Sequence, residues 1–211
     1  MSAQAQQERR RERRAEARRV ILDASDALLT EGGQGAFSIR RLVERCGYTA
    51  PTIYQYFGDK DGLLDEILAL DFEQLLAQLD RAPQSGDPVE DLTRLAQIFV
   101  RHGIRHPNHY QLHFLPRSPD WQPPAVIDET RAHFDRIWER LREEGRMSGD
   151  PESAAQSLWA LCHGLISGRI HRPDRPWSKT LNQDAIGALL RGLVEPAKAK
   201  GTRRRKKESK C

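Results

Sequence analysis

Four histidines in the sequence have the spacing of metal ligands. His102 and His106 are four residues apart, as are His109 and His113, and two histidines at i and i+4 of a helix can hold Zn²⁺ or Ni²⁺ between them. Pro107 interrupts any helix between the two pairs, and no Cys or carboxylate lies in phase with both. We therefore expect a structural or ligand-lining role for these histidines, with no metal site and no cofactor.

Motifs of the common enzyme classes are absent from the sequence. It contains no Gly-x-Ser-x-Gly, no phosphate-binding glycine loop and no His-Glu-x-x-His, and no candidate nucleophile stands near a base. The sequence therefore argues against an enzyme.

A different set of residues suits contacts with nucleic-acid bases. Residues 38–57 read S-I-R-R-L-V-E-R-C-G-Y-T-A-P-T-I-Y-Q-Y-F, which predicts two short helices joined by a tight turn at residues 46–48. Gly47 supplies the backbone freedom that a left-handed turn residue needs. The apolar residues that can pack between the helices are Leu42, Val43, Cys46, Ile53 and Phe57. Four residues then remain on the outer face of the second helix, where small and amide side chains reach base edges in a major groove: Thr49, Ala50, Thr52 and Gln55.

The charge distribution also favours a polyanionic partner. Residues 1–19 hold seven Arg against three Glu, and residues 198–210 hold eight Lys or Arg against one Glu, so the intervening residues carry −7 within a net charge of +4. An acidic body with two basic ends is a common layout in proteins that bind nucleic acid. The alternative is that both ends are solvated tails that aid solubility.

Helical periodicity runs through nearly the whole chain, and no segment alternates like a strand. The expected fold is all-α with about nine helices. The first carries the apolar stripe of Val20, Ile21, Ala24, Ala27 and Leu28 and stops at Gly32 and Gly33. The others are expected at 38–45, from Thr49 onward, from about 60 to near Pro83, and at 88–106, 107–115, 123–145, 151–171 and 181–195.

The segment that follows the two short helices resembles a known family. T-I-Y-Q-Y-F-G-D-K-D-G-L-L (52–64) is similar to the characteristic motif of TetR-family transcriptional regulators, and the resemblance covers about residues 18–70. It implies a cytoplasmic homodimer that binds double-stranded operator DNA. The resemblance also implies a helix-turn-helix DNA-binding domain (18–70) and a ligand-binding and dimerisation domain (71–196). Charge sets apart a basic N-terminal arm (1–17) and a basic tail (197–211), which we expect to be disordered because it has no apolar periodicity.

The resemblance assigns DNA-contacting roles to individual residues. It places Tyr54 and Lys60 on phosphates and Arg40 at or near the groove, while Thr49, Ala50, Thr52 and Gln55 fall in the recognition helix. Two positions depart from the family pattern, since Tyr48 stands where Val is usual and Tyr56 where His is usual. Tyr56 keeps a ring and a hydrogen-bond donor, so we include it among the phosphate contacts.

The C-terminal part carries a second, shorter resemblance. W-A-L-C-H-G (159–164) is similar to the Trp…His-Gly motif of one subgroup of TetR-family C-terminal domains. Gly164 and Gly168, at i and i+4, indicate a seam where another helix approaches closely. Family resemblance places the last two helices in the dimer interface, with an intrachain core as the alternative for any single residue. The expected interface consists of Leu158, Leu161, Gly164, Leu165, Gly168, Ile186, Leu189, Leu190 and Leu193.

Aromatic residues in the C-terminal part are candidates for an effector pocket. They are Phe99, Tyr110, Phe114, Phe134, Trp138, Trp159 and His163, and the alternative is that they only fill the core. The leading functional hypothesis is a repressor released from a palindromic operator by an unknown small molecule. The alternative is an activator, or a DNA-binding protein without an effector.

Compartment and membrane association are also constrained. No apolar run approaches the length of a membrane span, and the N-terminus has no hydrophobic stretch after its charges. The three cysteines, Cys46, Cys162 and Cys211, are far apart, which suits a reducing cytoplasm.

Overall fold

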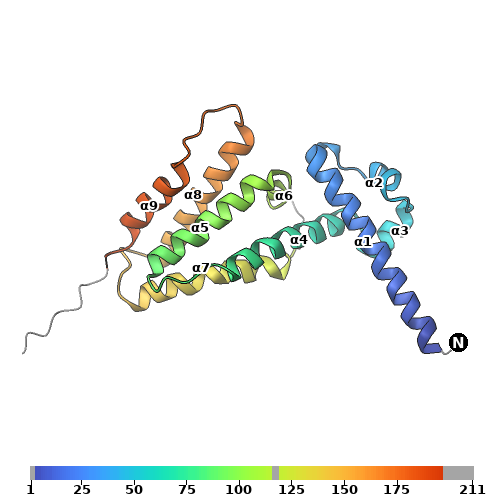
Figure 1. The fold of residues 1–211 in the computed structure, drawn as a ribbon, viewed down its shortest axis with the longest axis horizontal. Coiled ribbons are helices and arrows are strands. Elements are labelled where there is room, and N and C mark those ends of the chain that lie inside the picture. The colour runs from blue at the N-terminus through green and yellow to red at the C-terminus, as the bar shows by residue number, and fades with distance from the viewer. Residues whose placement is uncertain (1–2, 116–118, 197–211) are drawn as a thin grey trace, which may run out of the picture.

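The computed structural model describes residues 3–115 and 119–196. Within these residues the chain forms nine α-helices and no named strand, so the all-α prediction is confirmed. The helices are α1 (Ala3–Ala36), α2 (Ile39–Cys46), α3 (Ala50–Phe57), α4 (Lys60–Asp80), α5 (Pro88–Arg105), α6 (Pro107–Leu112), α7 (Ala125–Glu143), α8 (Pro151–His171) and α9 (Leu181–Leu193). Figure 1 shows α1–α3 at one end of the molecule and α5–α9 at the other, with α4 running between them. The predicted tail, 197–211, lies outside the described residues.

Capping residues explain where the short helices begin and end. Ser38 accepts a hydrogen bond from the backbone N–H of Arg41 at the start of α2, and Gly47 ends that helix with φ 75° and ψ 2°. Thr49 caps α3 in the same way, and Asp59 caps α4. Such caps satisfy backbone donors that a helix leaves unpaired, so the two helices and their turn lie where the sequence predicts them.

The N-terminal helix is longer than expected. Residues 3–17, predicted as an arm, continue α1 as regular helix, because they are rich in Ala, Gln, Glu and Arg, which are strong helix formers. Figure 1 shows this first half projecting beyond α3. The predicted stop at Gly32 and Gly33 is a kink instead: Gly33 has φ 62° and ψ −165°, and helix resumes as far as Ala36.

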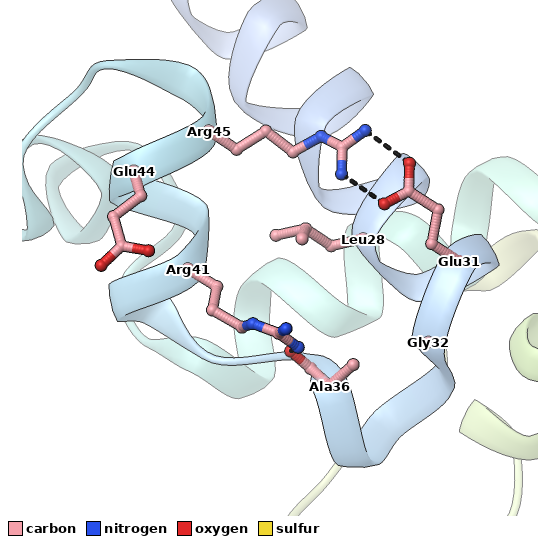
Figure 2. Close-up of a pocket in the computed structure, with 7 residues that line it drawn as sticks. All are labelled: Leu28, Glu31, Gly32, Ala36, Arg41, Glu44 and Arg45. Atoms are coloured by element: carbon pink, nitrogen blue, oxygen red, sulfur yellow. Dashed lines mark hydrogen bonds and ion pairs between the residues drawn. The ribbon is translucent and has the colours of Figure 1, made fainter.

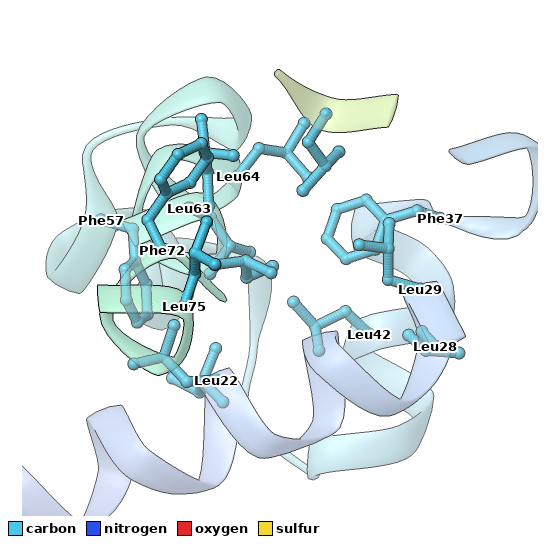
Figure 3. Packing of buried hydrophobic residues seen from close by; sticks show 14 of the residues in the cluster. Leu22, Leu28, Leu29, Phe37, Leu42, Phe57, Leu63, Leu64, Phe72 and Leu75 are labelled. Atoms are coloured by element: carbon cyan, nitrogen blue, oxygen red, sulfur yellow. The ribbon is translucent and has the colours of Figure 1, made fainter. Parts of the chain in front are cut away.

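One apolar cluster holds the N-terminal half together (Figure 3). Ile21 and Leu29 of α1, Leu42 of α2, Ile53 of α3 and Leu63 of α4 are completely buried in it. The cluster continues along α4 and takes in Leu112 of α6 and buried Leu95 and Ile98 of α5, together with half-buried residues of α7. It therefore extends beyond the three-helix unit.

Helix α4 crosses the predicted domain boundary at residues 70 and 71. It packs on α1 and α3 and also on α5, α6 and α7. A second apolar cluster, which includes Leu92, Leu141, Ile166 and Ile186, joins α5, α7, α8 and α9. The five later helices have their predicted bounds to within three residues. The two predicted domains thus share one continuous helix.

The turn residue Gly47 gives a direct test of this local structure. A Cβ at Gly47 would meet nothing within 4 Å, so Gly47→Ala acts only through its left-handed φ and should destabilise the protein by about 1 kcal/mol. Gly35→Ala is the control, since that position is equally open and has no positive φ. Urea unfolding followed by circular dichroism measures both. Equal midpoints for the two variants would contradict the assignment.

Candidate nucleic-acid interface

Helix α3 presents one buried and one exposed face. Ile53 and Phe57 point into the core, being 0% and 8% exposed. Gln55 follows Ile53 by two residues, which places it about 200° around the helix, and it is exposed to solvent, as is Tyr54. The face that carries Gln55 is thus accessible to an extended ligand such as a DNA duplex.

The two threonines of the predicted recognition helix also serve its geometry. The Thr49 hydroxyl oxygen accepts a hydrogen bond from the Thr52 backbone N–H and lies 2.9 Å from the Thr52 hydroxyl oxygen. Thr49 is exposed, while Thr52 and Ala50 are half-buried. These three residues lie in the first turn of α3, the part that enters a major groove first in helix-turn-helix proteins.

Two cations flank this face. Lys60, the first residue of α4, is exposed, and its Nζ lies 5.8 Å from the centre of the Phe37 ring. The side chain of Arg40 is 90% exposed and donates from Nε to a carboxylate oxygen of Glu44 at 3.2 Å. Exposed ion pairs of this kind are weak, so a phosphate can replace Glu44 as the partner of Arg40.

Tyr56 and Tyr48 have a different environment from Tyr54. Both are half-buried and help to line a shallow depression against α1, which also includes Ala17. The guanidinium carbon of Arg14 lies 5.8 Å above the centre of the Tyr56 ring. Tyr56 therefore contacts the projecting half of α1, which brings exposed arginines, among them Arg13 and Arg14, close to α3. The excess of Arg in residues 1–19 indicated this basic element but not its helical form.

Two exposed arginines of α2 contact α1. Arg45 forms a two-pronged ion pair with Glu31, with both N–O distances 2.6 Å, and Arg41 donates to the Ala36 carbonyl oxygen at 3.0 Å. The Arg45 guanidinium lowers the pKa of Glu31. Figure 2 shows these side chains around an open depression of about 450 Å³ between α1 and α2. They add polar contacts between α1 and α2 at the edge of the apolar cluster that already joins these helices.

Most of the residues predicted to line an effector pocket contact one another. The Tyr110 hydroxyl oxygen lies 3.0 Å from His163 Nδ1, and the Trp159 ring stacks on His163 at 5.5 Å between ring centres. Further ring contacts join Phe114 to His163, Tyr110 to Phe99, and Phe99 to Phe134. We call these six residues the aromatic group. Trp138 is the exception, because it is buried in the second apolar cluster, at 5% exposure.

The aromatic group is open to solvent at one end. Trp159 and Phe114 are 51% and 42% exposed, unusual for large apolar side chains, while Tyr110 is half-buried. Burial raises the pKa of Tyr110, and it raises the pKa of the neighbouring Cys162 thiol to about 12. The group thus combines an exposed aromatic surface with a neutral polar pair, Tyr110 and His163, behind it.

The predicted interface residues lie in two environments. Four of them are buried within the single chain, which agrees with the alternative that they belong to the core of one subunit: Leu158, Leu165, Ile186 and Leu190. Leu161, Leu189 and Leu193 are half-buried, and Gly164 is exposed with nothing within 4 Å of a Cβ. The expectation that Gly168 admits another helix is wrong within this chain. A Cβ there would lie 2.9 Å from the Trp177 ring, so an indole from the α8–α9 loop takes the space.

The histidines do not form two matched pairs. His102 Nε2 lies 3.1 Å and His106 Nδ1 lies 3.5 Å from Asp71 Oδ1, whereas His109 Nε2 lies 2.7 Å from Asp26 Oδ1. The sequence argument considered only carboxylates in phase with both pairs along the chain, and it did not find these two partners, because Asp71 comes from α4 and Asp26 from α1. A contact between helices far apart in sequence leaves no local spacing to recognise.

The geometry defines a helix-turn-helix protein with a helical second domain, and family models agree. Residues 21–67 match the model described as bacterial regulatory proteins, tetR family, and residues 92–198 match the tetracycline repressor-like C-terminal domain. Among the described residues, no helix is long and apolar enough to cross a membrane.

Individual proteins show the same relationship. The HTH-type transcriptional repressor KstR of Mycolicibacterium smegmatis is 37% identical over 191 residues, covering 89% of this chain and 93% of the relative. KstR of Mycobacterium tuberculosis is 34% identical over 151 residues, covering 70% and 68%.

Solved structures share the fold at lower identity. A Rhodococcus protein of unknown function has a TM-score of 0.66 at 24% identity, covering 85% of this chain and 96% of its own. RolR in complex with resorcinol has a TM-score of 0.64 at 19% identity, covering 88% and 91%. The chain belongs to the TetR family of bacterial regulatory proteins. It is a DNA-binding transcriptional regulator and not an enzyme.

The environment of His163 predicts a pH effect on stability. Burial, with a smaller contribution from His171, lowers the pKa of His163. Below the ordinary histidine value of about 6.5, the unfolded chain takes up a proton that the folded chain disfavours, so the free energy of unfolding decreases as the pH falls. Between about pH 7.5 and 5.5, wild type should lose more stability than His163→Gln. Urea unfolding at both pH values measures this, and equal losses would contradict it.

Proposed function

We propose that this ligand-responsive TetR-family repressor binds a palindromic operator as a homodimer, with α3 of each subunit in a major groove. The observation that carries the proposal is the exposed polar face of α3, held rigidly over a buried core. Gln55 and the first-turn residues Thr49, Ala50 and Thr52 contact base edges. Tyr54, Tyr56, Lys60 and Arg40 contact phosphates. Acting on bacterial DNA, the protein works in the cytoplasm.

The projecting half of α1 adds to the phosphate contacts. Its exposed arginines begin beside Tyr56 and continue away from the core, so they reach phosphates outside the groove that α3 occupies. Contacts of this kind raise affinity for any sequence, whereas base contacts determine which sequence is preferred.

Dimerisation uses the exposed side of α8 together with α9. Gly164, Leu161, Leu189 and Leu193 are not enclosed within one chain, and a small residue such as Gly164 lets the partner helix approach closely. A two-fold dimer places two copies of α3 on half-sites about 34 Å apart.

The effector site is the aromatic group. An apolar or aromatic small molecule fits against the exposed rings of Trp159 and Phe114, with the Tyr110–His163 pair as its polar contact. Tyr110 lies in α6 and Phe114 two residues beyond its end. Helix α6 also contacts α1, where Asn108 donates to the Thr30 carbonyl oxygen at 3.2 Å. Displacement of α6 by an effector therefore reaches the DNA-binding helices directly.

Lys60 tests the phosphate contacts. Lys60→Ala should weaken binding to all sequences alike and lower the slope of log affinity against log salt by about two units, one for each subunit. Gln55→Ala should instead relax discrimination at individual base pairs, each worth on the order of 1–3 kcal/mol. Lys179→Ala, an exposed lysine in the loop before α9, is the control for a change of charge alone. Fluorescence anisotropy on operator and random duplexes measures these effects, and a slope unchanged from wild type would remove Lys60 from the contacts.

Gly164 tests the dimer. Because a side chain there meets nothing in its own chain, Gly164→Leu should leave the subunit folded. In a two-fold interface it should cost roughly 1–3 kcal/mol at each of two sites, so the variant should sediment as a monomer at micromolar concentration and lose operator affinity. Gly35→Leu, at another open glycine, is the control. A dimeric Gly164→Leu protein would place the interface elsewhere.

A further inference from the structure

We propose that Asp71, His102 and His106 form a binding site for a divalent transition-metal ion of the Zn²⁺ class, at the junction between the DNA-binding helices and the effector domain. Their candidate ligand atoms all lie within 4.8 Å of one another. Two imidazole nitrogens and one carboxylate oxygen form a donor set that suits Zn²⁺ and Co²⁺. We call these three residues the junction cluster.

The measured separations match those of a bound ion. In a tetrahedral site with bonds of about 2.0–2.1 Å, neighbouring ligand atoms lie about 3.3 Å apart. Asp71 Oδ1 is 3.1 Å from His102 Nε2 and 3.5 Å from His106 Nδ1. Both distances from the carboxylate oxygen to the imidazole nitrogens therefore fit a bound ion with almost no movement of the side chains.

The third distance, between the two imidazole nitrogens, depends on the orientation of the His106 ring. The rings of His102 and His106 are stacked, with centres 4.5 Å apart. His106 is the residue after the last turn of α5, with non-helical φ −117° and ψ 56°, and its side chain is 33% exposed. Its ring can therefore rotate towards a shared ion, and its exposed side provides the entry path and a fourth position for water.

Burial favours an ion at this place. The side chains of Asp71 and His102 are only 7% and 4% exposed, and a carboxylate taken out of water needs compensating partners. An imidazole N–H provides part of this compensation, and a divalent ion provides more charge at the same atom. The pair holds its donor atoms in place before any ion arrives, which lowers the cost of binding.

A second residue is positioned to support His102 as a ligand. Gln78 Nε2 lies 3.0 Å from His102 Nδ1. When Nε2 binds a metal, the proton of a neutral imidazole is on Nδ1 and needs an acceptor. A half-turn of the Gln78 amide, which would give up the hydrogen bond from Nε2 to the Gln74 carbonyl oxygen at 3.2 Å, presents its oxygen to that proton, since the two ends of an amide have nearly the same shape.

The location gives the site a regulatory consequence that depends on the proposed function. Asp71 lies on α4, which runs into the DNA-binding end, whereas His102 lies on α5 of the effector domain and His106 directly follows it. An ion would fix these helices to one another. His109, whose ring centre is 6.1 Å from that of His106, continues the contact to Asp26 of α1. Metal binding would thus change operator affinity, typically by 5–150-fold for coupled sites.

Cobalt binding tests the proposal without DNA. Tag-free, chelator-treated full-length protein is titrated with Co²⁺, and we expect one equivalent per chain with the visible absorption of a four-coordinate ion, abolished by Zn²⁺. His106→Gln and Asp71→Asn should each weaken Co²⁺ binding at least tenfold. His133→Gln is the matched control, because His133 forms a similar contact with Asp80, at 2.9 Å, without a second histidine. It should bind Co²⁺ like wild type.

Thermal unfolding distinguishes a metal site from a purely structural contact. Zn²⁺ should raise the melting temperature of wild type, since an ion that binds only the folded state stabilises it, and should not raise that of His106→Gln. Absence of Co²⁺ absorption in wild type, or unchanged absorption in both cluster variants, would overturn the proposal. Metal-free His106→Gln should still bind operator DNA, and loss of that binding in a folded dimer would count against the proposed function instead.

Discussion

The structure depends first on the burial of one face of α4 along its whole length. Leu63, Leu64, Ile67, Leu68 and Phe72 close the core of the DNA-binding end, and Leu75 and Leu79 continue the same face beneath the effector domain. Each such side chain contributes on the order of 1.5–3 kcal/mol when fully buried. With the apolar surface continuous across the predicted domain boundary, neither half can shift without disturbing contacts that also serve the other.

Polar contacts lie beside this apolar surface. Asp71 is buried within the α4 face, and its partners are His102 of α5 and His106 directly after it. Asp26 and Thr30 of α1 meet His109 and Asn108 of the short α6. Hydrogen bonds are directional and unpaired buried groups are costly, so these contacts favour particular arrangements of the helices over intermediate ones. Apolar packing holds the two halves together, and the polar contacts define how they are oriented.

Local signals in the sequence predicted most of the fold. Helix ends at Ser38, Gly47, Thr49 and Asp150 follow from capping chemistry, which acts within a few residues. The helical first half of α1 was missed because its residues are almost all polar and form no apolar stripe, although their helix propensity is high.

Contacts between distant residues could not be predicted in the same way. The approach of Trp177 to Gly168 and of Asp71 to two histidines depends on how helices pack in three dimensions, and spacing along one helix contains no information about it. The exposed α3 residues were within reach of prediction because a helix two turns long fixes which side each residue occupies once Ile53 and Phe57 are buried. The half-buried state of Tyr56 was not, because it depends on the path of α1.

The length of α4 determines how far a small tilt of this helix moves the DNA-binding end. Its 21 residues span about 31 Å at 1.5 Å per residue, so a tilt of only about six degrees at one end displaces the other by about 3 Å. That displacement is close to the 3.4 Å spacing of successive base pairs. In a two-fold dimer this displacement occurs in both subunits at once. The distance between the two copies of α3 then no longer matches the spacing of the half-sites, by more than one base pair. A regulator whose two domains share one long helix therefore needs no refolding to release DNA. A tilt of α4 by a few degrees, which a single small molecule can cause, is enough.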